Sequence, residues 1–130
     1  MIFVAKRNIR AGEEVTDCYG IHHLSQPKSD RLPALDRGYA FTCACAACHK
    51  DFPLLQNLPS KLPPAVVAKL GTTLSKYKSL FEDGKLEKAS RMCVEYIDKL
   101  ERSGVKVPHR NYEIASMALC TCKWGLVKGL

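Results

Sequence analysis

The sequence predicts an α+β chain, in which a β-rich amino-terminal part with a zinc-bound cysteine loop is followed by an antiparallel α-helical array. Short apolar segments separated by turns lie within residues 1–40, and three cysteines lie close together within residues 41–50. Apolar residues then recur every three or four positions through residues 65–130. The first pattern is typical of strands and the last of amphipathic helices. The proline-rich residues 51–64 are the expected linker.

Strand-like composition is confined to the amino-terminal part. Residues 2–5, Ile-Phe-Val-Ala, have the composition of one strand, and residues 14–16 that of a second strand after a turn at residues 9–13. A helical stretch opens at residues 25–27 and continues past Pro33. Proline is tolerated in the first turn of a helix and kinks a helix interior, so the helix either starts at Pro33 or kinks there.

The cysteine loop is the segment Cys43-Ala-Cys45-Ala-Ala-Cys48. A structural zinc ion takes four tetrahedral ligands, commonly all cysteine. Gaps of one and two residues let the backbone fold round the ion, so we expect these three thiols to bind Zn²⁺. The alternative is a turn of small residues that holds reduced structural cysteines.

The fourth ligand is not evident in the sequence. His49 is adjacent to a cysteine of the loop and reaches poorly, and Cys18 should point along the strand that it ends. Cys120 and Cys122 diverge by about 200° on a helix and cannot serve one site together. We therefore expect the fourth ligand outside this chain.

Three helices of about four turns are predicted after the linker, because apolar residues there follow helical spacing. Asp83-Gly84 and Ser103-Gly104 separate them. The length and the small residues Gly71 and Ala89 of the first pair are typical of a tetratricopeptide-like unit. The predicted apolar faces are Val67, Leu70, Leu74, Tyr77 and Phe81; then Leu86, Ala89, Cys93, Tyr96 and Leu100; and then Tyr112, Ala115, Leu119, Cys122 and Leu126.

Composition restricts the class of protein. The chain has 130 residues, a net charge of +7 and seven cysteines. An odd number of cysteines without a secretory signal favours a reducing, intracellular location, with Cys93, Cys120 and Cys122 as core residues. The positive charge is spread along predicted helices, which favours solvated faces over direct nucleic-acid binding. No apolar run approaches the ~20 residues of a membrane helix, so we expect no membrane partner.

Several motifs in a fixed order resemble the SET and MYND domain (SMYD) family of protein-lysine methyltransferases. They are residues 7–15, Cys18-Tyr19, residues 31–35 and the segment from Tyr39 to Cys48. The resemblance implies that residues 1–40 are the C-terminal part of a SET domain and that residues 41–50 are the post-SET zinc loop. After the linker, residues 65–130 would start the tetratricopeptide-like C-terminal domain of the family.

The resemblance also implies roles for three aromatic residues. Tyr19 and Tyr39 would be catalytic, lining the channel of the substrate lysine from two sides. Tyr39 and Phe41 would bind the cofactor S-adenosylmethionine, with Phe41 stacked on its adenine. Aromatic faces stabilise a sulfonium cation, and an apolar channel favours the neutral lysine amine that attacks. The alternative is ordinary packing: Tyr19 as a half-buried residue at a strand end, and Tyr39 and Phe41 as core.

The sequence contains neither the Asn-His-Ser-Cys motif nor the MYND module of the family. We therefore expect a fragment of an S-adenosylmethionine-dependent protein-lysine N-methyltransferase that is inactive in isolation. The resemblance implies a histone or non-histone protein substrate and a location in cytoplasm and nucleus.

Two other functions stay open. One is an adaptor, stabilised by zinc, that binds a partner peptide on its helical array. The other is a thiol redox or metal-transfer protein. Cofactor binding distinguishes the adaptor from the enzyme. Zinc that resists mild oxidation would argue against the redox function.

Overall fold

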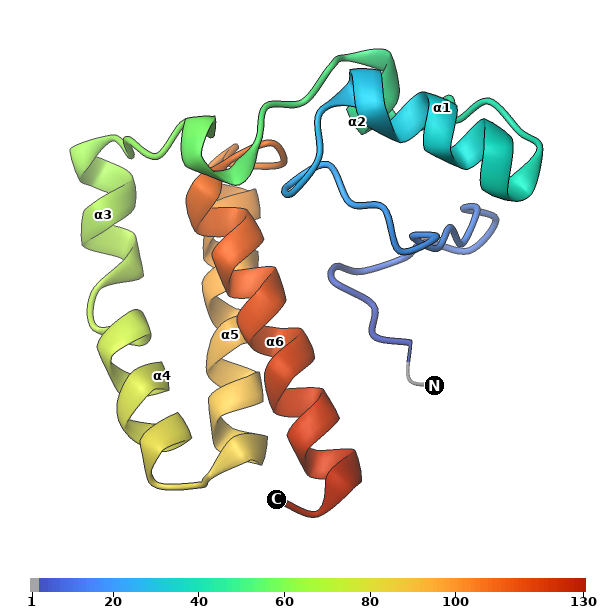
Figure 1. Ribbon diagram of the computed structural model, residues 1–130. Helices are drawn as coiled ribbons and strands as arrows, with labels where there is room; N and C mark the ends of the chain where they lie inside the picture. Colours follow the sequence, from blue (N-terminus) through green and yellow to red (C-terminus); the bar gives the residue numbers. More distant parts are fainter. Residues whose placement is uncertain (1–2) are drawn as a thin grey trace. The chain divides into compact units, whose positions relative to one another are not determined.

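The structure is a computed structural model in which residues 3–130 are described (Figure 1). The chain forms two compact units. One unit is Gly12–Pro59, and the other is Ser60–Leu130 together with the amino-terminal residues up to Ala11. The first unit carries the cysteine loop, and the second contains the long helices.

The unit Gly12–Pro59 is built from short helices and irregular segments. Its elements are α1 (Lys28–Tyr39), α2 (Ala46–His49) and the 3₁₀ helix η1 (Leu55–Asn57). Helix α1 begins directly after Pro27 and runs through Pro33, so it does not start at that second proline. The buried side chains of this unit are Arg31, Leu35, Ala47, Cys48, Phe52 and Leu58.

The prediction of a β-rich SET fragment, and with it the α+β class, is wrong for the described residues. Residues 3–130 contain no strand and no sheet. Phe3–Ala5 and Glu14–Thr16 lie in unpaired, irregular backbone, while Ile2 is outside the described residues. Strand-like composition selects side chains that suit a sheet, but a strand also needs a partner for its backbone. Val15 is 76% exposed and thus has no apolar layer to pack against.

The second unit contains α3 (Pro64–Leu70), α4 (Thr73–Glu82), α5 (Leu86–Arg102) and α6 (Arg110–Lys128). Helices α4, α5 and α6 lie side by side and alternate in direction (Figure 1). Turns at Gly84 and Gly104, both with positive φ, connect them. Helices joined by short turns pack as antiparallel neighbours.

The core of this unit lies mainly between α5 and α6. The predicted apolar face of residues 86–100 is buried throughout, and that of residues 112–126 is buried except for the half-buried Leu126. Both of these predictions are confirmed. The core cluster consists of Val66, Leu70, Cys93, Tyr96, Ile97, Leu100, Tyr112, Ala115 and Leu119.

The prediction of a single first helix is wrong, because the helix is broken into α3 and α4. Gly71 ends α3 with φ of +52°, a conformation that disfavours other residues. The hydroxyl of Thr73 donates to the Leu70 carbonyl at 2.7 Å and so accommodates the break. The predicted apolar face is also largely wrong, since Val67, Leu74 and Phe81 are exposed and Leu70 alone of its five residues is buried.

Two side-chain hydrogen bonds connect α5 to α6. The Tyr112 hydroxyl donates to Glu101 at 2.7 Å, and the Asn111 amide donates to the Tyr96 hydroxyl at 3.2 Å. Each joins α6 to α5. Within residues 3–130, none of the helices is long and apolar enough to cross a membrane.

Candidate functional site

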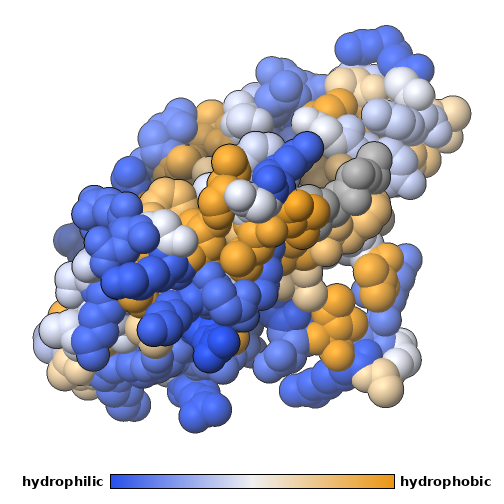
Figure 2. All heavy atoms as spheres, turned by 90° about the horizontal axis from the view of Figure 1, so that it is seen from below, coloured by the Kyte–Doolittle hydropathy of each residue, from blue (hydrophilic) through white to orange (hydrophobic). Residues whose placement is uncertain are grey.

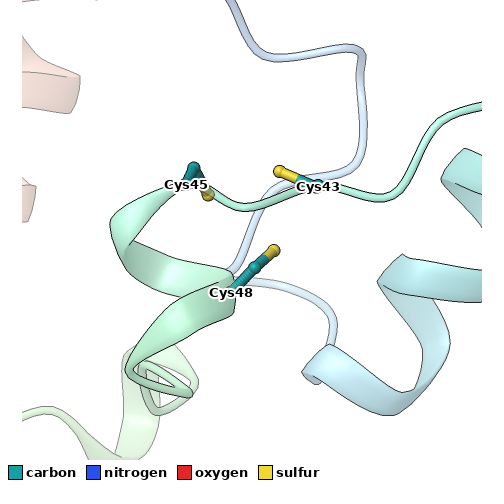
Figure 3. A group of neighbouring side chains, drawn as sticks. All are labelled: Cys43, Cys45 and Cys48. Carbon is teal, nitrogen blue, oxygen red and sulfur yellow. The ribbon is translucent and has the colours of Figure 1, made fainter.

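The cysteine loop folds as a short knuckle at the start of α2. Cys45 precedes the helix, and its carbonyl accepts from the N–H groups of Cys48 at 3.0 Å and His49 at 2.8 Å. The alanines between the cysteines leave the turn free of bulky side chains. This turn brings Cys48 back beneath Cys43, which lies on the irregular segment before the helix (Figure 3).

The three sulfur atoms are arranged as a metal site. The Sγ atoms of Cys43, Cys45 and Cys48 all lie within 4.8 Å of one another. Tetrahedral coordination at the usual zinc–sulfur length of roughly 2.3 Å places sulfurs about 3.8 Å apart. A contraction of up to about an ångström would therefore seat one ion among them. The predicted three-thiol cluster is thus brought together in the fold.

Ionisation is unequal within the cluster. Burial, with the neighbouring thiols of Cys45 and Cys48, raises the pKa of the Cys43 thiol to about 11. Burial also opposes ionisation of Cys45, but the nearby Cys48 N–H and the neighbouring thiols of Cys43 and Cys48 favour its thiolate, and the pKa of Cys45 is lowered overall. Cys45 therefore ionises more readily than Cys43. Thiolate is the form that ligates zinc.

No fourth ligand joins the cluster within residues 3–130. The group of side chains suited to hold a metal comprises the three cysteines without His49 or Cys18. Cys122 is buried on α6, and Cys120 is half-buried on the same helix. Within the described residues the three thiols therefore fill three of the four positions of a tetrahedral zinc site.

The predicted aromatic residues form a second cluster just before the cysteines. The ring centroids of Tyr19 and Tyr39 are 4.8 Å apart, edge to face, and those of Tyr19 and Phe41 are 5.5 Å apart. The Tyr39 hydroxyl donates to the Tyr19 carbonyl at 3.5 Å. Tyr19 and Tyr39 are each about half exposed, so these rings are accessible to a ligand.

Two backbone turns create this aromatic cluster. Gly20, with φ of +78°, donates its N–H to the Cys18 carbonyl at 2.8 Å, which closes a tight turn around Tyr19. Ala40 ends α1 in the left-handed region with φ of +55°, between Tyr39 and Phe41. A non-glycine residue there costs about 1–2 kcal/mol. The chain reverses direction at that residue, so that Phe41 contacts Tyr19 although it lies outside the helix.

Arg31 is a site residue that the sequence analysis missed. It lies on α1 and is only 2% exposed. Its Nη2 atom donates to the Cys48 Sγ at 3.5 Å and to the Ala47 carbonyl at 3.4 Å. Its position in the sequence could have indicated its burial. Arg31 stands four residues before the buried Leu35 and so lies on the same face of the helix.

The paired histidines His22 and His23 pack within the unit Gly12–Pro59. His22 and His23 are half-buried, with ring centroids 4.4 Å apart. The His22 Nδ1 accepts from the Leu24 N–H at 3.2 Å, and the His23 ring meets Phe52 edge to face at 5.5 Å. They pack the segment that precedes α1 and are not part of the thiol cluster.

The chain is similar to SET and MYND domain proteins over a short stretch. It is 46% identical over 41 residues, 32% of its length, to a SET and MYND domain-containing protein of Dictyostelium discoideum. It is 38% identical over 47 residues to the protein-lysine N-methyltransferase SMYD4 of Homo sapiens and 36% identical over 47 residues to that of Danio rerio, in each case 36% of this chain.

The matched stretch spans 3% of the Dictyostelium protein and 6% of each of these two methyltransferases. No family model matches the chain, and no solved structure matches it. The resemblance to SET and MYND domain proteins is therefore confirmed over about a third of the chain. The roles predicted for Tyr19, Tyr39 and Phe41 stay predictions.

Proposed function

We propose that this chain is part of an S-adenosylmethionine-dependent protein-lysine N-methyltransferase. The observation that carries the proposal is the contact of Tyr19 with Tyr39 and Phe41, directly before a three-thiol cluster. The local similarity to proteins named as lysine methyltransferases supports the same chemistry. In this proposal the three rings form one side of the site where the substrate lysine and the methyl donor meet.

The exposed rings suit a cationic ligand. S-adenosylmethionine, when bound, supplies a methyl group on a positively charged sulfonium. Aromatic faces attract such a cation within about 6 Å of the ring centroid. Tyr19 and Tyr39 would also exclude water from the lysine amine, which favours its neutral, nucleophilic form. Holding the amine in line with the methyl group would supply much of the remaining acceleration.

The cysteine cluster has a supporting role in this proposal. Cys43, Cys45 and Cys48 would hold Zn²⁺ and so fix the segment that follows Phe41. The ion would not take part in methyl transfer. The partner would be a protein presenting a lysine, histone or non-histone, in the cytoplasm and nucleus. The boundaries predicted by resemblance, at residues 1–40, 41–50, 51–64 and 65–130, stay predictions.

A nuclear magnetic resonance titration tests the aromatic site. We expect S-adenosylmethionine at millimolar concentration to shift the ring resonances of Tyr19, Tyr39 and Phe41 in the zinc-loaded chain. Replacing Phe41 by Leu should abolish the shifts, because it removes one ring face. The matched control is Phe81→Leu, which removes a partly exposed ring from α4. Unchanged rings of the aromatic cluster, or shifts confined to α6, would contradict the proposal.

Methyl transfer by the isolated chain is a separate question. We propose that the chain is inactive by itself, because the aromatic cluster would cover a ligand from one side only and half of each tyrosine is open to water. Tritiated S-adenosylmethionine with a panel of histone and non-histone peptides should give no labelled product. Robust labelling would refute the proposed inactivity.

A second candidate is an adaptor that binds a partner peptide on the helical unit. Ile114, Met117 and Trp124 are between 44% and 50% exposed and share one face of α6. Figure 2, seen from the end with the α4–α5 turn, shows hydrophobic patches between hydrophilic side chains. The adaptor predicts no binding of S-adenosylmethionine in calorimetry, whereas the enzyme predicts weak binding.

A further inference from the structure

Arg31 is a buried cation in the interior of the unit Gly12–Pro59. It is 2% exposed, although arginine is normally found at the surface. One arm of its guanidinium donates from Nη1 to the Gln26 carbonyl at 2.6 Å. The other arm donates from Nη2 to the Ala47 carbonyl at 3.4 Å and to the Cys48 Sγ at 3.5 Å. These contacts connect α1, the segment before it and the cysteine knuckle.

A buried guanidinium needs a negative partner, because removing its charge from water costs free energy. Within residues 3–130, Arg31 forms no ion pair with a carboxylate. The two carbonyl oxygens are neutral. The group beside Arg31 that can carry negative charge is the sulfur of Cys48, itself 3% exposed.

Metal binding would supply that negative charge permanently. A divalent ion held by three thiolates carries one net negative charge, which one guanidinium balances. Hydrogen bonds from such outer groups orient ligands and are known to tune metal affinity about 10- to 100-fold. The planar fork of arginine suits a contact with both sulfur and carbonyl oxygen better than the ammonium of lysine does.

We infer that Arg31 is a positioning residue of the metal centre and the buried counter-charge of its thiolate cluster. The inference rests on the proposed metal site. Arg31 also joins that site to the aromatic cluster, because the helix that holds it ends in Tyr39. Loss of the guanidinium would weaken metal binding at Cys48 and loosen the connection between the knuckle and α1.

Metal affinity of the full chain tests this inference. Zinc affinity is measured by competition with a chromophoric chelator, and Co²⁺ replaces zinc to report the thiolate charge-transfer absorption. We expect Arg31→Met to lower zinc affinity about 10- to 100-fold and to shift the cobalt band. Arg31→Lys keeps the charge but not the fork, so it should lose less affinity than Arg31→Met. The matched control is Arg37→Met, an exposed arginine on the same helix, which should leave both measurements unchanged.

The outcomes separate the inference from the metal site itself. Tight metal binding by the natural chain together with unchanged affinity and cobalt spectrum in Arg31→Met would overturn the inference and leave the metal site standing. Absence of metal binding in the natural chain would overturn both. If Arg31→Met does not fold, judged by circular dichroism, Arg31→Gln decides, because it removes the charge and keeps a polar side chain: natural affinity with an unshifted band would overturn the inference, and a weaker, shifted site would support it.

Discussion

Removal of the metal ion is expected to unfold residues 12–59 and to leave the helical unit folded. The buried apolar side chains of the first unit are Leu35, Ala47, Cys48, Phe52 and Leu58. Domains this short rarely have a sufficient hydrophobic core and often depend on a metal or disulfides. Its cysteines are free. The unit should therefore depend on the metal for its stability.

The size of the effect follows from linkage between folding and binding. A ligand at a free concentration a thousand times its Kd stabilises the folded state by about 4 kcal/mol. A hydrophobic core in a chain below about 70–80 residues rarely supplies more than about 3–5 kcal/mol. Loss of the ion would thus remove a contribution as large as that of the whole core of this unit.

Hydrogen exchange followed by mass spectrometry measures this effect directly. The informative amides are those of His49, Lys50 and Phe52, which donate to carbonyls of the knuckle at 2.8, 2.9 and 3.0 Å. Their protection should fall to that of an unfolded chain when a strong chelator removes zinc. Amides of α5, such as that of Leu100, serve as the internal control and should stay protected. Unchanged protection of the knuckle after verified loss of zinc would refute the reasoning.

Three further predictions concern packing, ionisation and backbone strain. Leu100 is fully buried, so Leu100→Ala should destabilise the helical unit by about 2–5 kcal/mol in urea unfolding, whereas the exposed Val127→Ala should change it by less than about 0.5 kcal/mol. Burial raises the pKa of Cys93 from 9.0 to about 12 and that of Tyr77 from 10.0 to about 12. The folded state thus holds these protons more tightly, and urea midpoints should stay level up to pH of about 9 and fall as pH approaches about 12. A rising midpoint would contradict this assignment. Ala40→Gly should stabilise the unit Gly12–Pro59 by about 1 kcal/mol, because φ of +55° strains alanine, and a loss of thermal stability would contradict that.

The helical part of the fold was largely predictable because its apolar spacing reports burial directly. Cys93, Leu100 and Leu119 lie in the core as their positions predict. The same spacing continues from Leu70 into α4 although the helix breaks at Gly71. A periodic pattern is insensitive to a single residue with positive φ, so the break was missed.

The amino-terminal part was less predictable for two physical reasons. Composition at residues 14–16 suits a strand, but pairing depends on a partner segment that composition does not reveal. Arg31 was missed because a charged residue is ordinarily expected in solvent, and its burial depends on the sulfur that the knuckle places beside it. The thiol cluster itself was predictable, since its ligands are close in sequence and one turn of backbone brings them together.

The central claim is that Cys43, Cys45 and Cys48 together hold one zinc ion next to the aromatic cluster. Elemental mass spectrometry of the full chain, purified under reducing conditions, tests it most directly. The account predicts one zinc per chain, and loss of that zinc in Cys45→Ser, whose exposed side chain can change without disturbing the core. A chain without bound zinc, or one that keeps its zinc after Cys45→Ser, would contradict it.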